Sequence, residues 1–321
     1  MEKVFGVDTL VSRSELKKFV RRNDIAGLTN LGFHFLALGG SGTLIYLSLG
    51  KFWLVPAMFI HGVIIAFLFA PMHETSHGTA FRTRWLNELV FRFISVIYIS
   101  PPIFFRYFHA AHHTYTQIPG KDPDVVMPNP GTWTRYLSYI SSLPFWKRNF
   151  TWFLSHACGK VSKRDSWYIP KDELPRIYRE VRVMLSVYAV LATVSIVTSS
   201  TILLYYWLIP RVMGEPIMRW IRVTEHCGCE ESANLLKNTR TTRAASWFHL
   251  LFWNMSYHAE HHLSPAVPFH ALPHLHKRIG NYLHPVGKGY LAVHSEVLSN
   301  IRNRLYPPSK ISHNQSGTDR I

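Results

Sequence analysis

Two copies of the pattern His-x-x-His-His constrain this chain more than any other feature of its sequence. They read HAAHH at residues 109–113 and HAEHH at residues 258–262. Side chains three and four positions apart lie on one face of a helix, about one turn apart. Neutral imidazole is the commonest metal ligand among protein side chains. The two motifs therefore predict two helices that each offer several ring nitrogens to a metal.

A third motif, HETSH at residues 73–77, repeats the helical spacing and gains weight beside the other two. The three motifs together supply eight imidazoles: His73, His77, His109, His112, His113, His258, His261 and His262. One ion takes about four to six ligands, so eight imidazoles are too many for a single metal. Two bound metal ions are the simplest explanation for this number of imidazoles.

A ninth histidine, His226, follows the last long apolar stretch. By spacing alone, a single histidine beside a membrane is more often an interfacial residue than a ligand. Its neighbours Cys227 and Cys229 lack the second ligand pair that a structural zinc site needs. We therefore expect these two to be small buried cysteines.

Two apolar runs, residues 31–49 and 52–70, contain no Asp, Glu, Lys or Arg. Each is long enough to cross a hydrocarbon layer of ~30 Å as a helix. Only Gly50 and Lys51 separate them, which predicts a tight hairpin. The basic residues on either side of this hairpin then lie on the cytosolic face, as the positive-inside rule expects.

A third uncharged stretch covers residues 184–210. As a single span it would place the last histidine motif across the membrane from the others, which a shared metal centre forbids. We therefore predict a second hairpin that turns near Ser199, Ser200 and Thr201. The apolar residues 89–105, interrupted by Arg92, fit a membrane-surface or partly buried segment better than a span.

These segments predict an all-α integral membrane protein with four transmembrane helices in two hairpins and a cytosolic helical cap that carries the histidines. The expected organisation is an amphipathic cytosolic N-terminal segment (1–30), a membrane catalytic domain (31–305) and a disordered polar tail (306–321). The active site is expected on the cytosolic face, in a bacterial inner membrane or the endoplasmic reticulum.

The net charge of +16 favours contact with anionic lipid surfaces or an acidic protein partner. No recognised nucleic-acid motif is visible, so we expect no nucleic-acid partner. Lys237, Arg240 and Arg243 fit either a docking patch for lipid headgroups or an electron donor, or simple positive-inside anchors.

Two other classes of protein match parts of the pattern. HETSH also fits HExxH, the signature of zinc proteases in which the glutamate is the general base. An intramembrane protease of this kind would leave six further paired histidines unused. A membrane receptor or transporter with a structural zinc or copper site would need fewer ligands and more spans. A count of bound metal separates these alternatives, because both predict one metal per chain.

Taken together, the sequence resembles the membrane fatty acid desaturase superfamily from about residue 31 to residue 280. The resemblance rests on the three histidine motifs in this order, with one hairpin before the first and another between the second and third. Further support comes from YTQIPGKDPD at 115–124, NTRTT at 238–242 and PAVPFH at 265–270.

This resemblance implies two non-haem iron ions and O2 as co-substrate. The implied metal ligands are His73, His77, His109, His112, His113, His226, His258, His261 and His262. The resemblance favours His226 as a metal ligand, because relatives carry an isolated histidine between the last span and the third motif. Acidic residues near the ligands are expected to orient or assist them: Glu74 and Glu260 as the catalytic pair, with Glu225, Asp122 and Asp124 beside them.

The implied activity is O2-dependent desaturation of a lipid acyl chain. Hydroxylation of a carotenoid or another membrane lipid is the alternative, because related hydroxylases share the motifs. The chain contains no fused cytochrome b5 motif, flavin fingerprint or ferredoxin cysteine spacing. Electrons are therefore expected from a separate donor protein of the ferredoxin or cytochrome b5 type, and an acidic donor would complement the positive charge.

Overall fold

The computed structural model describes residues 7–124 and 129–306, and this part of the chain is almost entirely helical. Its strands are β1 (Thr241–Thr242) and β2 (Val286–Gly287), which pair in parallel. The predicted all-α class is confirmed for the described residues. The predicted polar tail lies outside them except for its first residue.

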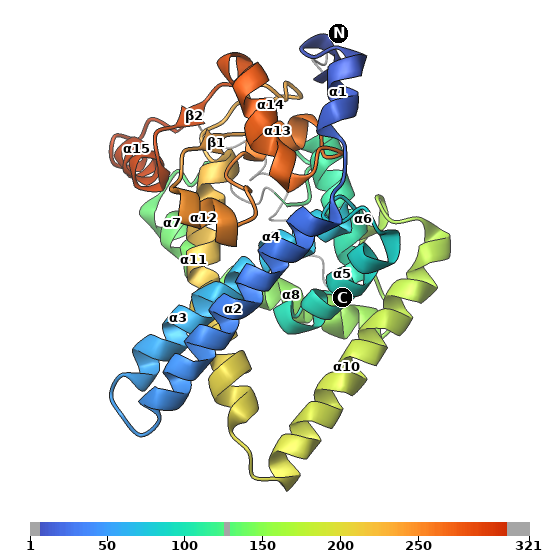
Figure 1. Cartoon of the computed structure of the whole chain (residues 1–321), viewed down its shortest axis with the longest axis vertical. Coiled ribbons are helices and arrows are strands. Elements are labelled where there is room, and N and C mark those ends of the chain that lie inside the picture. Colours follow the sequence, from blue (N-terminus) through green and yellow to red (C-terminus); the bar gives the residue numbers. More distant parts are fainter. Residues whose placement is uncertain (1–6, 125–128, 307–321) are drawn as a thin grey trace.

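The N-terminal part forms the first hairpin. After the short turn η1 (Val7–Thr9), helix α1 (Arg13–Phe19) begins at a capping box made by Ser12 and Glu15. Helix α2 (Asp24–Ser48) runs down one side of the molecule, and α3 (Leu54–Phe67) returns along it and continues into α4 (Phe69–Ser76) (Figure 1). Gly50, at φ +70°, occupies the left-handed region in the turn between them.

The next two helices meet at a sharp bend. Helix α5 (Arg84–Tyr98) and helix α6 (Pro102–Tyr115) are inclined at 98° to each other. Ile99 is left-handed, with φ 61°, and Pro101 cannot continue a helix, so the chain must change direction here. The apolar residues 89–105 therefore do not form one straight span.

A second reversal follows a group of short helices. The elements of this part are α7 (Trp133–Ile140), α8 (Leu143–Ala157), α9 (Lys163–Ser166), η2 (Lys171–Glu173), α10 (Leu174–Val197), the π-helical turn η3 (Leu204–Leu208) and α11 (Ile209–His226). Helix α10 runs away from the body of the molecule, and η3 with α11 runs back towards it (Figure 1). The reversal lies between Val197 and Leu204, at the residues where the sequence predicts it.

Not every apolar segment is a candidate span. Within the described residues, three helical stretches are long and apolar enough to cross a membrane: Asp24–Ser48, Leu54–Ser76 and Lys171–Val197. The bent pair α5–α6 would make a fourth if it counts as one span. Helix α11 differs from these because it carries the buried charges of Arg211, Glu215 and Arg219.

Helices α3 and α11 approach very closely where Gly62 faces Gly214. A Cβ atom on Gly62 would collide with the carbonyl oxygen of Pro210, and one on Gly214 would collide with the backbone of Gly62. Small residues allow two helix backbones to touch in this way. This contact brings the C-terminal end of α11, and so His226, to the level of α4.

The C-terminal part forms a cap over the ends of α4, α6 and α11 (Figure 1). Its elements are α12 (Ser246–Leu251), α13 (His258–Leu263), η4 (Phe269–Ala271), α14 (Leu272–Ile279), η5 (Gly280–Tyr282) and α15 (Tyr290–Arg302). The cap has its own buried core, in which Leu263, Leu272 and Leu275 pack together. A larger core beneath it joins Phe69, Phe91 and residues 252–253.

Candidate metal centre

The nine histidines expected as ligands come together in two groups. The first histidine group contains His73, His77, His109, His113 and His261. The second histidine group contains His112, His226, His258 and His262. In each group the nitrogens offered by its members lie within 4.8 Å of one another. Helices α4, α6, α11 and α13, which are far apart in the sequence, therefore meet at one place.

The His-x-x-His-His motif divides its side chains between the two groups. In α6, His109 and His113 belong to the first group and His112 to the second. Consecutive residues of an α-helix diverge by about 100°, so the adjacent His112 and His113 point in different directions. Helix α13 does the same with His261 and His262. One motif thus serves two sites from one short helix.

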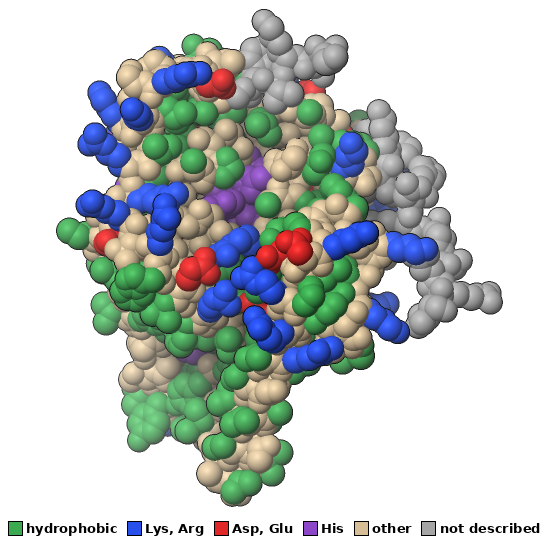
Figure 2. All heavy atoms as spheres, turned by 90° about the vertical axis from the view of Figure 1, so that its right-hand side faces the viewer, with side chains coloured by type: hydrophobic (Ala, Val, Ile, Leu, Met, Phe, Trp, Pro, Cys, Tyr) green, Lys and Arg blue, Asp and Glu red, His purple; other side chains and the backbone are tan. Residues whose placement is uncertain are grey.

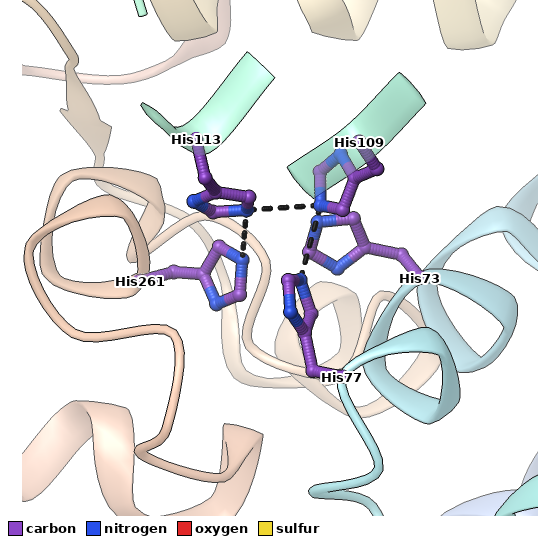
Figure 3. A group of neighbouring side chains, drawn as sticks. All are labelled: His73, His77, His109, His113 and His261. Carbon is purple, nitrogen blue, oxygen red and sulfur yellow. Dashed lines mark hydrogen bonds between the residues drawn. The ribbon is translucent and has the colours of Figure 1, made fainter. Parts of the chain in front are cut away.

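In the first group, ring nitrogens face one another at close range (Figure 3). The Nε2 atom of His109 lies 3.0 Å from that of His77 and 2.9 Å from that of His113, which lies 3.1 Å from Nε2 of His261. A neutral Nε2 carries one hydrogen or one lone pair, so a two-centre hydrogen bond satisfies only one of the two contacts of His109. Nitrogens bound at right angles to one ion lie about 3 Å apart.

The environment of His73 also indicates a metal ion in the first group. Its ring is fully buried, and neither of its nitrogens has a hydrogen-bond partner in the described chain. A buried polar atom without a partner is costly, and a bound cation removes that cost. The first group therefore fits a metal ion held by imidazole nitrogens.

The second group has the same close contacts between nitrogens. Nε2 of His258 lies 3.2 Å from Nε2 of His226 and 3.1 Å from Nε2 of His262. On the far side of the His226 ring, Nδ1 lies 3.4 Å from the carbonyl oxygen of Asn238. The inner nitrogens thus converge while an outer one faces the backbone.

Hydrogen bonds fix the rings of His112 and His262. Asp122 accepts from Nδ1 of His112 at 2.9 Å, and its carboxylate also accepts from backbone amides. Thr116 donates its hydroxyl hydrogen to the carbonyl of His112 at 2.6 Å, so at 3.0 Å it accepts from Nδ1 of His262. Both rings then carry their lone pair on Nε2. A carboxylate behind a ligand histidine is typical of metal sites.

Burial favours the neutral form of three histidines of this site, whereas the neighbouring Asp122 raises the pKa of His112. Burial lowers the pKa of His258, His261 and His262 well below 6.5, because a charged ring would be desolvated there. Burial alone would raise the pKa of Asp122, but the neighbouring His112 holds it below its usual range. These three rings thus offer lone pairs near neutral pH, and the Asp122 carboxylate lies behind His112.

Glu74 and Glu260 lie behind the histidine motifs. Glu74 accepts from the hydroxyl of Thr79 at 2.6 Å and from the amide of Phe269 at 3.1 Å. Glu260 pairs with Thr241 and His276. In the hydrogen bonds of the described residues, neither carboxylate contacts a histidine of the two groups. These contacts connect α4 and α13, which carry ligand histidines, to neighbouring segments of the chain. A catalytic role for either residue stays a prediction.

Two orienting residues could not be assigned from the sequence. Thr116 and Asn238 lie in the segments that support the family resemblance, but nothing in the spacing of either shows that it faces a ligand ring. The spacing of Thr116, four residues after His112, is compatible with the hydrogen bond that its hydroxyl donates to the His112 carbonyl oxygen.

The interpretation of Arg240 as part of a surface patch is wrong. Its side chain is buried and donates to the carbonyl oxygens of Thr224 and Cys227, both at 2.8 Å, at the end of α11. A cation at a helix C-terminus satisfies carbonyls that have no partner within the helix. Cys227 and Cys229 are free and buried as expected.

Comparison with known proteins identifies the family. The sequence matches the fatty acid desaturase family over residues 51–294, which is more than half of the chain. The chain belongs to this family. It is therefore an oxidoreductase, and its apolar helices fit the integral membrane character of the family.

Its curated relatives carry out different reactions. The chain is 26% identical over 260 residues to the beta-carotene 4-ketolase 3 of Haematococcus lacustris, covering 77% of this chain and 68% of the relative. A beta-carotene ketolase of the same organism matches equally well. A Delta(5) fatty acid desaturase of Caenorhabditis elegans is 23% identical over 256 residues, covering 71% of this chain and 57% of the relative.

Proposed function

We propose that this chain catalyses the O2-dependent desaturation of a lipid acyl chain at a pair of non-haem iron ions held by its two histidine groups. The observation that carries the proposal is the convergence of nine imidazoles from four helices into two adjacent groups. Imidazole suits iron, and a structural zinc site closes with four ligands, fewer than the five of the first group.

The iron pair, when bound, supplies the chemistry that reduces O2 and removes hydrogen from an unactivated carbon. The chain's own residues hold and shield it. His112 and His262 are oriented by Asp122 and Thr116, which keeps their lone pairs directed inward. Glu74 and Glu260 act as positioning residues that lock the first and third motifs to neighbouring segments.

Electrons come from a separate donor protein of the ferredoxin or cytochrome b5 type. His77 and His113 are only partly buried, whereas the other members of the first group are buried. Figure 2 shows histidine side chains in a hollow of the surface, with Lys and Arg side chains gathered below it. The excess positive charge would favour an acidic donor there.

The active site lies on the cytosolic face of a bacterial inner membrane or the endoplasmic reticulum. In this arrangement α2 with α3–α4 and α10 with η3–α11 form two transmembrane hairpins, and α12 to α15 belong to the cytosolic cap. Both reversals, at residues 49–53 and 198–203, lie at the same end of the molecule in Figure 1, away from the histidine motifs.

The second candidate reaction is oxygenation of a carotenoid, since two of the relatives are named as carotene ketolases. Expression in a host that lacks desaturases but supplies a donor, followed by mass spectrometry of its lipids, tests both. An acyl lipid lighter by two hydrogens supports desaturation. A carotenoid that gains oxygen supports the second candidate and contradicts the first.

A further inference from the structure

Helix α10 is the least covered of the candidate spans. In the apolar window of Lys171–Val197, 17% of the residues are buried, compared with 28% for Asp24–Ser48 and 61% for Leu54–Ser76. Figure 1 shows α10 standing well apart from α2 and α3. In a bilayer, lipid therefore covers most of the surface of this helix.

One exposed face of α10 changes from charged to apolar along its length. Arg179 and Arg182 are followed by Val183, Val187 and Val190, and all five residues are exposed. Intervals of three, four and seven positions place side chains on the same side of a helix. The two guanidinium groups and the three valines therefore form one continuous face.

The position of Arg182 matches the boundary between headgroups and hydrocarbon. Arg182 is the last charged residue before the uncharged residues 183–210. An arginine at such a boundary extends its charged end to the headgroups, and the next turns of the helix contact acyl chains. From Val183 to Val190 the helix rises about 10 Å, which fits within one leaflet of a hydrocarbon core of ~30 Å.

The acidic groups near this face are already paired. Glu173 lies 2.6 Å from Arg176. Glu180 lies 3.2 Å from Arg92 and also accepts from an amide at the start of α6 at 2.7 Å. Arg179 makes no hydrogen bond or ion pair with the described residues. The face therefore carries positive charge that the described chain does not compensate.

The side chain of Arg182 is held in place by the end of α8. Its Nε atom donates to the carbonyl oxygen of Ala157 at 2.9 Å, and its two Nη atoms make no hydrogen bond within the described chain. Arg179 lies three positions earlier, where Cβ atoms on one helix face are about 5–6 Å apart. A phosphate accepts several hydrogen bonds from guanidinium groups, so one phosphate can contact both arginines.

We propose that this face of α10 binds an anionic phospholipid, with the phosphate at Arg179 and Arg182 and an acyl chain along Val183, Val187 and Val190. This lipid is a bound component of the helix surface and not the substrate, because α10 contributes no residue to either histidine group. A zwitterionic lipid offers the same chains, but its headgroup adds a positive charge beside two uncompensated guanidinium groups. The inference goes beyond the proposed reaction and rests only on α10 as a transmembrane helix.

The test is equilibrium binding of labelled phosphatidylglycerol and phosphatidylcholine, with identical acyl chains, to the purified full chain in detergent. An arginine beside an anionic headgroup contributes about fivefold in affinity, so the native protein should prefer phosphatidylglycerol by about tenfold or more. Arg179→Gln should lower this preference by about fivefold, and the double variant Arg179→Gln/Arg182→Gln should remove it. Since Arg179 has no partner among the described residues, the single variant should fold like the native protein.

The matched control is Arg13→Gln/Lys17→Gln, which removes the same charge from exposed residues of α1 and should keep the native preference. Equal affinity of the native protein for the two lipids overturns the proposal. A preference that the α10 variants lower no more than the control does also overturns it.

A further arm adds glycerol phosphate as a soluble competitor. Displacement of the bound lipid at comparable concentrations would show that the valines contribute nothing, and it would overturn the assignment to a phospholipid. Because binding is measured without turnover, a host that forms no new lipid contradicts the proposed reaction and leaves this result standing.

Discussion

The two histidine groups differ in burial and in the hydrogen bonds that hold the outer sides of their rings. In the second group every ring is buried, and outer hydrogen bonds to Asp122 and Thr116 hold two of them. In the first group the Nδ1 atoms of His73, His109, His113 and His261 have no partner among the described residues. The second group is therefore fully buried with two of its rings held by outer hydrogen bonds, and the first group is more exposed and lacks such bonds at these atoms.

The strongest test of this division replaces adjacent residues of α13. We expect His261→Ala to remove the metal of the first group and His262→Ala that of the second, leaving one metal per chain in each variant. Activity should fall more than ~100-fold in both, because loss of a direct ligand exceeds loss of an orienting residue. Metal analysis with turnover measures this. Loss of both metals from either variant alone would argue against two separable sites.

The next largest effect is expected from Asp122→Asn. The amide keeps the shape but loses the charge that holds the His112 ring, so metal affinity of the second group should weaken by about 10–100-fold. Competition with a chelator of known affinity gives this value. Asp172→Asn, at an exposed site, is the control and should behave like the native protein. An equal loss from the first group would remove the distinction between the groups.

How much of this centre the sequence predicts depends on whether a feature is local. The spacing within 109–113 and 258–262 places imidazoles on helix faces, and this followed from helical geometry alone. The turn near Ser199 also followed, once a shared metal centre required all motifs on one side. In these cases the constraint lies within one helix or one loop.

Long-range contacts could not be predicted. The division of His112 and His113 between two groups depends on where α11 and α13 lie relative to α6. The bond from Phe269 to Glu74 joins residues 195 positions apart, and nothing in either motif indicates it. Nothing in the sequence indicates that Arg211 and Glu215 are buried, because the apolar run ends just before them.

A smaller effect concerns the rate of metal loss. Because His77 and His113 are partly exposed, a chelator should remove the metal of the first group several-fold faster than that of the second. A time course of metal release should therefore show two phases of equal amplitude. His261→Ala should retain only the slow phase. A single phase in the native protein would contradict the difference in accessibility.

A last effect concerns the stability of the metal-free protein, whose pH dependence both groups share. In the metal-free protein His258, His261 and His262 have a pKa well below 6.5, so below about pH 6.5 the unfolded chain binds more protons than the folded one. The free energy of unfolding should therefore decrease as the pH is lowered, by up to about 1.4 kcal/mol per histidine for each pH unit below 6.5. Thermal unfolding of metal-free protein at pH 7.5 and 5.5 measures this, and an unchanged midpoint would show that the rings are not buried neutral.

The most direct test of the two-metal centre is metal analysis of the purified native chain, combined with Mössbauer spectroscopy after growth on enriched iron. The arrangement of nine histidines predicts two iron atoms per chain, in two environments that differ because one has a carboxylate behind its ligands. A single zinc at full occupancy would contradict it.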